Sequence, residues 1–352
     1  MFKIESTESF NADRLVNGNE YDYITRTSVN QGIMKTTGFI NSENINPSGI
    51  WSLGLLQMTF FYREKSWYAG QFVRKIIPKI SIPKNAVLYF TTVLNMCKSK
   101  LLSVLVRNVD ETFKETSVKL PIKSNGKIDF DFMENFIAEL KEERLAELRA
   151  YLKVCGLDNY ELTNEEKEVI QEFDNLEFAK CDLISVFDVK NTSNILSDDI
   201  IKNSGTVPYL CASSINNAVN SYISYDNRFL ERGNCIFIGG KTFIVSYQEK
   251  DFFSNDSHNL ALYLKNYKRT KYNQLYLVTC LYKSLNSKYS WGNSISKKKI
   301  MSDKIYLPVK NGKIDYETMD RFISAVQKLV IKDVVLYADR EIEATEKIIN
   351  NN

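Results

Sequence analysis

The stretch Leu120-Pro121-Ile122-Lys123, followed by Gly126-Lys127-Ile128-Asp129-Phe130, decides the architecture because it occurs twice in the chain. Its second copy is Leu307-Pro308-Val309-Lys310, followed by Gly312-Lys313-Ile314-Asp315-Tyr316. The two copies lie about 186 residues apart. Self-similarity at a fixed spacing indicates that one structural unit is present twice.

Other matches keep the same order and nearly the same spacing. The matched pairs are Tyr23–Ile33 with Tyr209–Val219, Tyr62–Tyr68 with Tyr247–Phe253, Leu88–Phe90 with Leu275–Leu277, and Met133 and Phe136 with Met319 and Phe322. Chance can supply one such match, but several in order indicate duplication of a unit of about 130 residues. A unit of that length is a domain in size.

Each copy has the pattern of a mixed domain. Asn234–Ile238 and Lys241–Tyr247 read as two strands joined by the turn Gly239-Gly240, and Ile50–Tyr62 is the equivalent hairpin of the first copy. Ala86–Lys100 and Gln274–Leu285 carry the longer apolar spacing of helices. The predicted fold class is therefore α+β.

A long amphipathic helix is predicted after each Gly-Lys-Ile-Asp turn, with Asp129 or Asp131 capping the first and the second beginning near Glu317. One interpretation of their apolar stripes is ordinary intradomain core. The other is that the two related helices pack against each other as a coiled-coil-like spacer. The stripe residues are Met133, Phe136, Ile137, Leu140, Met319, Phe322, Ile323 and Val326.

Between the two copies, Thr163-Asn164-Glu165-Glu166 has the form of a capping box and opens a shorter helix in a connector. The predicted organisation is a first domain over 1–128, a central helical region and connector over 129–182, a second domain over 183–315, and a C-terminal helix over 316–352.

Basic residues are concentrated in two segments that contain no carboxylate. No Asp or Glu lies between Glu64 and Asp110, where eight Lys and Arg occur, or between Asp256 and Asp303, where nine occur. Residues 129–182 instead hold sixteen acidic and six basic side chains. The net charge of +3 thus conceals a basic segment in each copy, of the kind that neutralises nucleic-acid phosphates. The alternative is that these lysines are only solvated surface.

Polar side chains in the two copies have donors and acceptors suited to DNA. The candidates for contact with base edges are Thr25, Arg26, Asn30, Gln31, Ser213, Asn216 and Asn217, which could equally satisfy backbone groups in turns. The candidates for contact with phosphates are Arg63, Lys65, Arg74, Lys75, Lys79, Lys241, Lys268, Arg269, Lys271, Lys297, Lys298 and Lys299.

Catalytic motifs are not found in the sequence. The single histidine, His258, follows a polar turn and is interpreted as a surface residue, and the scattered cysteines do not form a metal-binding pattern. Asn46-Pro47 is followed by Ser48 rather than by the second proline of a DNA-methylation motif, and no Walker loop is present. No signal peptide or membrane-spanning run is evident, so a cytoplasmic location is expected.

The duplicated domains, the Tyr-hydrophobic-Ser/Thr motif and the Leu-Pro turn leading into a long helix resemble the specificity subunits of type I restriction-modification systems and the related type IIB subunits. The resemblance implies two target recognition domains that read the halves of a split site in double-stranded DNA and are held apart by two antiparallel helices. It also implies DNA methyltransferase subunits as partners, with a restriction or translocating subunit in some assemblies. No cofactor is expected in this chain, because S-adenosylmethionine would belong to the methyltransferase.

The chain departs from the family pattern at its N-terminus, and other functions are left open. The first copy begins at Phe2, so the strand-like segment before Phe187 has no counterpart at the N-terminus. The alternatives are a stand-alone DNA-binding or interaction protein that contacts only phosphates, and a metal-dependent nuclease that uses scattered carboxylates. Insensitivity to base sequence would favour the former, and Mg²⁺-dependent cleavage by the chain alone would favour the latter.

Overall fold

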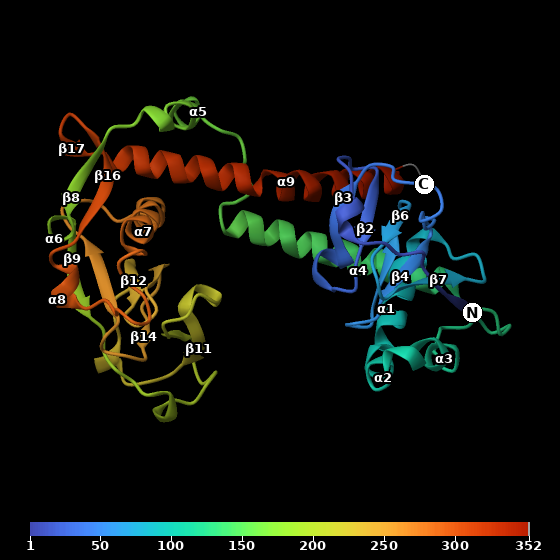
Figure 1. Ribbon diagram of the computed structural model, residues 1–352. Helices are drawn as coiled ribbons and strands as arrows, with labels where there is room; N and C mark the ends of the chain where they lie inside the picture. Colours follow the sequence, from blue (N-terminus) through green and yellow to red (C-terminus); the bar gives the residue numbers. More distant parts are fainter. Residues whose placement is uncertain (351–352) are drawn as a thin grey trace. The chain divides into compact units, whose positions relative to one another are not determined.

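The computed structural model describes residues 1–350, with side chains through Glu343. The chain divides into two compact units, Met1–Leu148 and a second unit that begins at Arg149. Both units contain helices and strands, which confirms the predicted α+β class (Figure 1).

The first unit contains a four-stranded antiparallel sheet in the order β1-β7-β4-β5 and a three-stranded sheet in the order β3-β2-β6, in which β2 and β6 run parallel. Its strands are β1 (Phe2–Ser6), β2 (Tyr21–Ile24), β3 (Ile33–Thr37), β4 (Ile50–Gly54), β5 (Thr59–Arg63), β6 (Trp67–Ala69) and β7 (Val73–Pro78). Its helices are α1 (Val87–Met96), α2 (Lys98–Leu102), α3 (Val109–Lys114) and most of α4 (Phe130–Val154).

The second unit repeats this topology. A four-stranded antiparallel sheet has the order β13-β12-β15-β9, and a three-stranded sheet has the order β11-β10-β14 with β10 and β14 parallel. The corresponding strands are β9 (Phe187–Asn191), β10 (Val207–Leu210), β11 (Val219–Ile223), β12 (Cys235–Gly239), β13 (Ile244–Gln248), β14 (Phe253–Ser254) and β15 (Leu260–Leu264). The helices are α5 (Asn164–Gln171), α6 (Leu183–Val186), α7 (Lys271–Leu285), α8 (Lys297–Ile300) and α9 (Tyr316–Asn350).

The duplication extends to strand irregularities. The β2–β3 pair has a register shift between Tyr23 and Ile24, and the β10–β11 pair has one between Tyr209 and Leu210. The second unit adds a sheet in the order β17-β16-β8, formed by β8 (Phe178–Asp182), β16 (Lys304–Lys310) and β17 (Lys313–Ile314). Among the described residues of the first unit, the sheets contain no strand equivalent to β8.

Each domain core continues into the first turns of its long helix. The first core joins β4 and β5 to α1, and includes Trp51, Phe60 and Phe90 as well as Met133 of α4. The second joins β12 and β15 to α7, and includes Met319 of α9. Because an apolar helix face gains most of its stability from burial, these methionines fix each helix to its domain.

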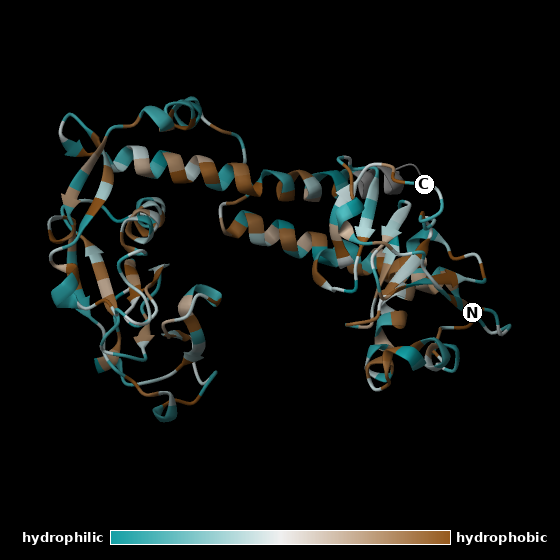
Figure 2. Cartoon of the chain, in the orientation of Figure 1, coloured by the Kyte–Doolittle hydropathy of each residue, from teal (hydrophilic) through white to brown (hydrophobic). Residues whose placement is uncertain are grey.

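Both long helices begin with an aspartate that accepts a backbone hydrogen bond. Phe132 N donates to Asp129 Oδ1 at 3.0 Å, and Thr318 N donates to Asp315 Oδ1 at 3.0 Å. Asp131 instead forms an ion pair with Lys123. Figure 2 shows hydrophobic and hydrophilic segments alternating along α9, as expected of an amphipathic helix.

The predicted connector helix is present as α5. Thr163 and Glu166 form the expected capping box, in which each side chain bonds to the other residue's backbone N–H. Glu166 also pairs with Lys328 of α9 at 2.8 Å and accepts a hydrogen bond from Ser324. The connector is therefore fixed to α9 by a buried ion pair.

Candidate nucleic-acid interface

The connection between β2 and β3 has an unusual backbone that recurs between β10 and β11. We call Thr25–Gly32 the first loop and Cys211–Ala218 the second loop. In the first, Asn30 and Gln31 have φ of 48° and 54°, and in the second, Asn216 and Asn217 have φ of 51° and 50°. Asparagine tolerates the left-handed conformation better than other residues with a side chain, and the contacts described below hold both loops, including Gln31, in this shape.

Equivalent hydrogen bonds close the two loops. Thr25 N donates to Gly32 O (2.8 Å), as Cys211 N does to Ala218 O (2.9 Å). Val29 N donates to Thr27 Oγ1 (3.1 Å), as Ile215 N does to Ser213 Oγ (3.2 Å). Asn30 Nδ2 donates to Ile33 O (3.2 Å), as Asn216 Nδ2 does to Val219 O (3.1 Å). The turn interpretation thus accounts for one hydrogen bond donated by each of Asn30 and Asn216 and for one accepted by Ser213.

Arg63, the last residue of β5, supports the first loop through its buried side chain. Its side chain is 3% exposed, its Nη2 donates to Gln31 O at 2.6 Å, and its Nε and Nη2 donate to Ser52 Oγ at 2.9 and 2.7 Å. Burial lowers the pKa of Arg63 to about 10, which leaves it charged at neutral pH. The prediction that Arg63 contacts phosphate is therefore wrong, because the guanidinium is enclosed beneath the loop.

Gln248, the last residue of β13, has the same position under the second loop. Its Nε2 donates to Asn217 O and to Ser246 Oγ, both at 2.9 Å. Asn217 Nδ2 in turn donates to Tyr247 O at 2.9 Å. Sequence reasoning did not identify Gln248, although its alignment with Arg63 in the repeat was an available signal.

A neighbouring hairpin turn supports each loop from one side. Ser28 N donates to Gln57 Oε1 at 3.1 Å from the β4–β5 turn, and Thr242 Oγ1 donates to Ala212 O at 3.0 Å from the β12–β13 turn. Gly239 of the second hairpin has no room for a side chain, since an added Cβ would lie 2.7 Å from Ala212 Cβ. The backbone of each loop is thus held by hydrogen bonds from two neighbouring elements.

The side chains at the loop tips point to solvent. Val29 is 72% exposed, and Ile215, its equivalent in the second loop, is 76% exposed. Arg26 and Gln31 are also exposed, with the Arg26 guanidinium 5.3 Å from the ring centre of Phe72, whereas Thr25 is half-buried. A fixed backbone with exposed apolar and hydrogen-bonding side chains is suited to contact base edges in a groove.

In the folded chain, carboxylates pair with several basic residues of the two segments that contain no Asp or Glu. Within these segments, ion pairs join Lys65 to Asp22 (2.8 Å), Arg74 to Asp110 (3.0 Å), Lys75 to Glu5 (3.5 Å) and Lys288 to Asp303. Lys241, which precedes the second segment, pairs with Asp256 (2.9 Å). These acids come from other segments or from the segment ends. The charges of Lys65, Arg74, Lys75 and Lys241 are therefore partly compensated.

Five of the predicted phosphate contacts are exposed and, among the described residues, form no ion pair: Lys79, Lys268, Lys271, Lys297 and Lys298. Two others have structural roles. Arg269 donates to Leu264 O and Asn234 O and lies 5.1 Å from the ring centre of Tyr263. Lys299 Nζ donates to Asn293 Oδ1 and Ser294 O at 2.8 and 2.7 Å.

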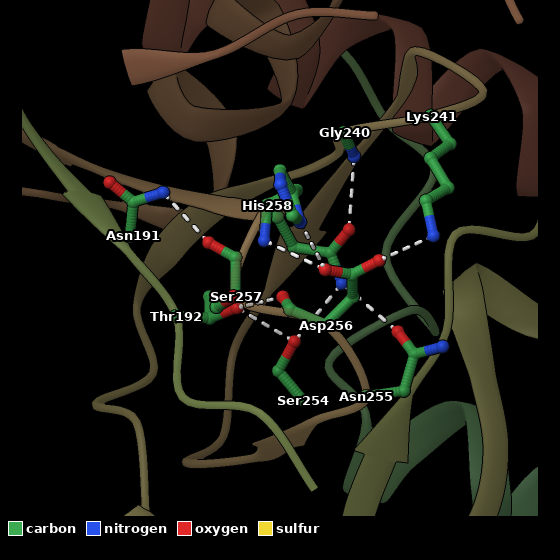
Figure 3. Close-up of polar contacts among 10 residues, drawn as sticks. Asn191, Thr192, Gly240, Lys241, Ser254, Asn255, Asp256, Ser257 and His258 are labelled. Atoms are coloured by element: carbon green, nitrogen blue, oxygen red, sulfur yellow. Dashed lines mark hydrogen bonds and ion pairs between the residues drawn. The ribbon is translucent and has the colours of Figure 1, made fainter. Parts of the chain in front are cut away.

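Asp256 organises the turn beside Lys241 (Figure 3). It accepts hydrogen bonds from Lys241 Nζ and His258 N, both at 2.9 Å, and its Oδ1 lies 2.8 Å from His258 Nδ1. Although burial acts to raise the pKa of Asp256, these partners lower it to about 2. His258 is an exposed residue, as predicted, with its ring held against Asp256.

The predicted helix stripe divides into buried and open parts. Met133 and Met319 are completely buried in their domain cores and Ile137 is buried, which agrees with the intradomain alternative. Phe322 stacks on Phe173 with ring centres 4.1 Å apart. Phe136 and Leu140 stay exposed, and Ile323 and Val326 are half-buried. Within the second unit, the end of α4 contacts α9 through Arg149 and Asp339 at 3.6 Å.

Comparison with protein families identifies the repeat. The family model described as "Type I restriction modification DNA specificity domain" matches residues 1–150 and again residues 175–335. The chain belongs to this family. It is a specificity subunit of restriction-modification systems, with two DNA-recognition domains and no catalytic role of its own. The nuclease alternative is accordingly set aside.

Relatives of this specificity subunit agree with that assignment. It is 23% identical over 275 residues to the "Type II restriction enzyme BgcI specificity subunit S.BcgI" of Heyndrickxia coagulans, covering 77% of this chain and 75% of the relative. The S subunit of a type I restriction-modification system from M. genitalium has the same fold, with a TM-score of 0.58 at 13% identity over 99% of this chain and 92% of that one. Within residues 1–350, no helix has the length and apolar character needed to cross a bilayer.

Proposed function

We propose that this specificity subunit reads a split target in double-stranded DNA, one half through the first loop and the other through the second. The observation that supports this most directly is the repeated pair of strained loops, each held by a buried side chain and each exposing its tip. The exposed side chains Arg26, Val29 and Gln31 would contact one half-site, and Ile215, Asn216 and Asn217 the other. The differing side chains imply different half-site sequences.

The proposed partners are DNA methyltransferase subunits, which bring S-adenosylmethionine, and in some assemblies a restriction or translocating subunit. The partly exposed apolar stripes of α4 and α9 support a role for these helices as a docking surface and spacer. A subunit that works on chromosomal DNA with these partners is expected in the cytoplasm.

Methylation mapping tests the proposal. The chain is expressed with its methyltransferase in a host that lacks both, and the methylated motif is compared for wild type, an Arg26→Ala/Gln31→Ala variant and an Ile215→Ala/Asn216→Ala variant. Wild type should methylate one split motif, and each double variant should relax base preference in one half only. Methylation that does not depend on this chain, or a change in neither half, would contradict the proposal.

Lys297 and Lys298 provide a separate prediction about phosphate contact. Replacing both with alanine should weaken binding of every duplex alike and reduce the slope of log Kd against log salt by about 0.9 per lost contact. Fluorescence anisotropy of labelled duplexes at several salt concentrations measures both quantities. Lys310→Ala, which removes an exposed lysine of β16, is the matched control. An unchanged slope would remove the pair from the interface.

A further inference from the structure

Trp291 is the one tryptophan that the fold leaves in solvent. Its side chain is 76% exposed, whereas Trp51 and Trp67, the other tryptophans of the chain, are 0% exposed. Indole is a large apolar group that usually gains stability by burial, so a tryptophan left open on a surface favours contact with a partner.

The turn that carries Trp291 is built by specific contacts. Ser290 and Asn293 exchange backbone hydrogen bonds, and Asn293 Nδ2 donates to Lys288 O at 2.8 Å. On the preceding side, Asp303 is 4% exposed, accepts from Tyr289 Oη at 2.6 Å and pairs with Lys288. Lys299 closes the other side by donating to Asn293. The indole is therefore presented by an ordered turn, which reduces the entropy lost on binding.

Hydrogen bonds connect this turn to the second loop. Ile295 N donates to Gly240 O at 3.1 Å, which joins the Trp291 turn to the β12–β13 turn. That turn contacts the second loop through Thr242 and Ala212, as described above. Lys297 and Lys298 follow Ile295 by two and three residues and are exposed. The indole thus belongs to the same connected group of turns as Ile215, and two exposed lysines without an ion pair among the described residues follow it in the same segment.

The first domain carries a smaller apolar residue at the equivalent place. Leu105 precedes Trp291 by the repeat spacing of about 186 residues and is 60% exposed. Four residues further along, Val109 and Ile295 are both buried, at 0% and 1% exposed, so the alignment holds in the cores as well as at the tips. An exposed apolar tip at this position is a repeated feature of both domains.

From these observations we infer that Trp291 packs its indole against the bases of the second half-site, next to the phosphates that Lys297 and Lys298 contact. The inference rests on the proposed function of the second domain. The partner is double-stranded DNA, because the surrounding surface is basic and the turn is continuous with the second loop. This apolar contact, which depends on DNA shape, adds to the hydrogen bonds by which the second loop recognises its half-site.

Tryptophan fluorescence tests this inference in the complete complex with the methyltransferase. Subtracting the acrylamide-quenching data of Trp291→Phe from those of wild type isolates Trp291, because the buried tryptophans and those of the partner are unchanged. Addition of the mapped duplex should reduce quenching of Trp291 several-fold. Trp291→Ala should raise Kd for that duplex about 5- to 100-fold, with the salt slope preserved.

Anisotropy of the labelled duplex separates the possible outcomes. Specific binding with unchanged quenching of Trp291 would overturn the inference and leave the proposed function intact. Protection of Trp291 by the methyltransferase without DNA would also overturn it, by assigning the indole to a protein interface. Absence of sequence-specific binding by wild type would overturn both proposals. Met301→Ala, at an exposed apolar residue beyond α8, is the matched control and should bind like wild type.

Discussion

Arg63→Lys is expected to abolish recognition through the first domain, although it conserves the positive charge. The guanidinium donates at once to Ser52 Oγ and to Gln31 O, and a lysine ammonium on a differently shaped stem cannot reproduce this planar fork. Leaving a buried charge without its partners costs about 3 kcal/mol. If this free energy destabilises the folded conformation of the first loop, the fraction of molecules with a loop able to bind DNA drops about 100-fold.

Methylation of the mapped motif and Kd for its duplex measure this loss. Lys65→Arg, two residues away and at the surface, is the control and should retain activity. A phosphate contact would tolerate Arg63→Lys well, so a variant that binds like wild type would refute the positioning role. Thermal unfolding of both variants distinguishes a displaced loop from a domain that has not folded.

Glu166→Gln should release α5 from α9 at neutral pH. Burial acts to raise the pKa of Glu166, but hydrogen bonds from Lys328, Ser324 and Thr163 N lower it below the ordinary 4.5. The amide cannot neutralise the buried ammonium of Lys328, so α5 should open more easily by about 2 kcal/mol. Hydrogen exchange of the α5 backbone amides measures this opening free energy.

The effect has a defined pH dependence. Because the folded pKa lies below the unfolded one, the carboxylate contributes its full stability above pH 4.5 and loses it as pH falls through the folded pKa. Wild type and Glu166→Gln should therefore differ at pH 7 and converge under strongly acidic conditions. Glu168→Gln, at an exposed residue of the same helix, should match wild type throughout. A difference between wild type and Glu166→Gln that persists at low pH would show that the ion pair is not the cause.

The sequence predicted the architecture because duplication leaves a signal that survives in the order of motifs. The Gly-Lys-Ile-Asp turns marked the start of both long helices, and the glycine turn at Gly239 marked a hairpin that the structure confirms. The loops at Asn30 and Asn216 were identified as polar segments in equivalent places. Their left-handed backbone was not, because it depends on support from residues distant in sequence.

The roles of individual charges were harder to predict, since a window along the chain does not show what packs across it. Arg63 is followed by Glu64 and Lys65 and resembles a surface residue, yet the first loop covers it at the end of β5. Asp22, Glu5 and Asp110 lie outside the acid-free window but reach its basic residues in space. Trp291 was missed although its signal, a Trp-Gly pair in a lysine-rich turn, was available.

The way in which the two loops are held has a consequence for how such a protein can change. Arg63 and Gln248 both donate to a main-chain carbonyl, at Gln31 and Asn217, and every residue type supplies that acceptor. Mutation of the exposed tip side chains Val29 and Ile215 therefore leaves the supporting hydrogen bond intact. A lineage can acquire a new target preference through substitutions at the tips of either loop while the scaffold beneath stays under a separate selection for stability.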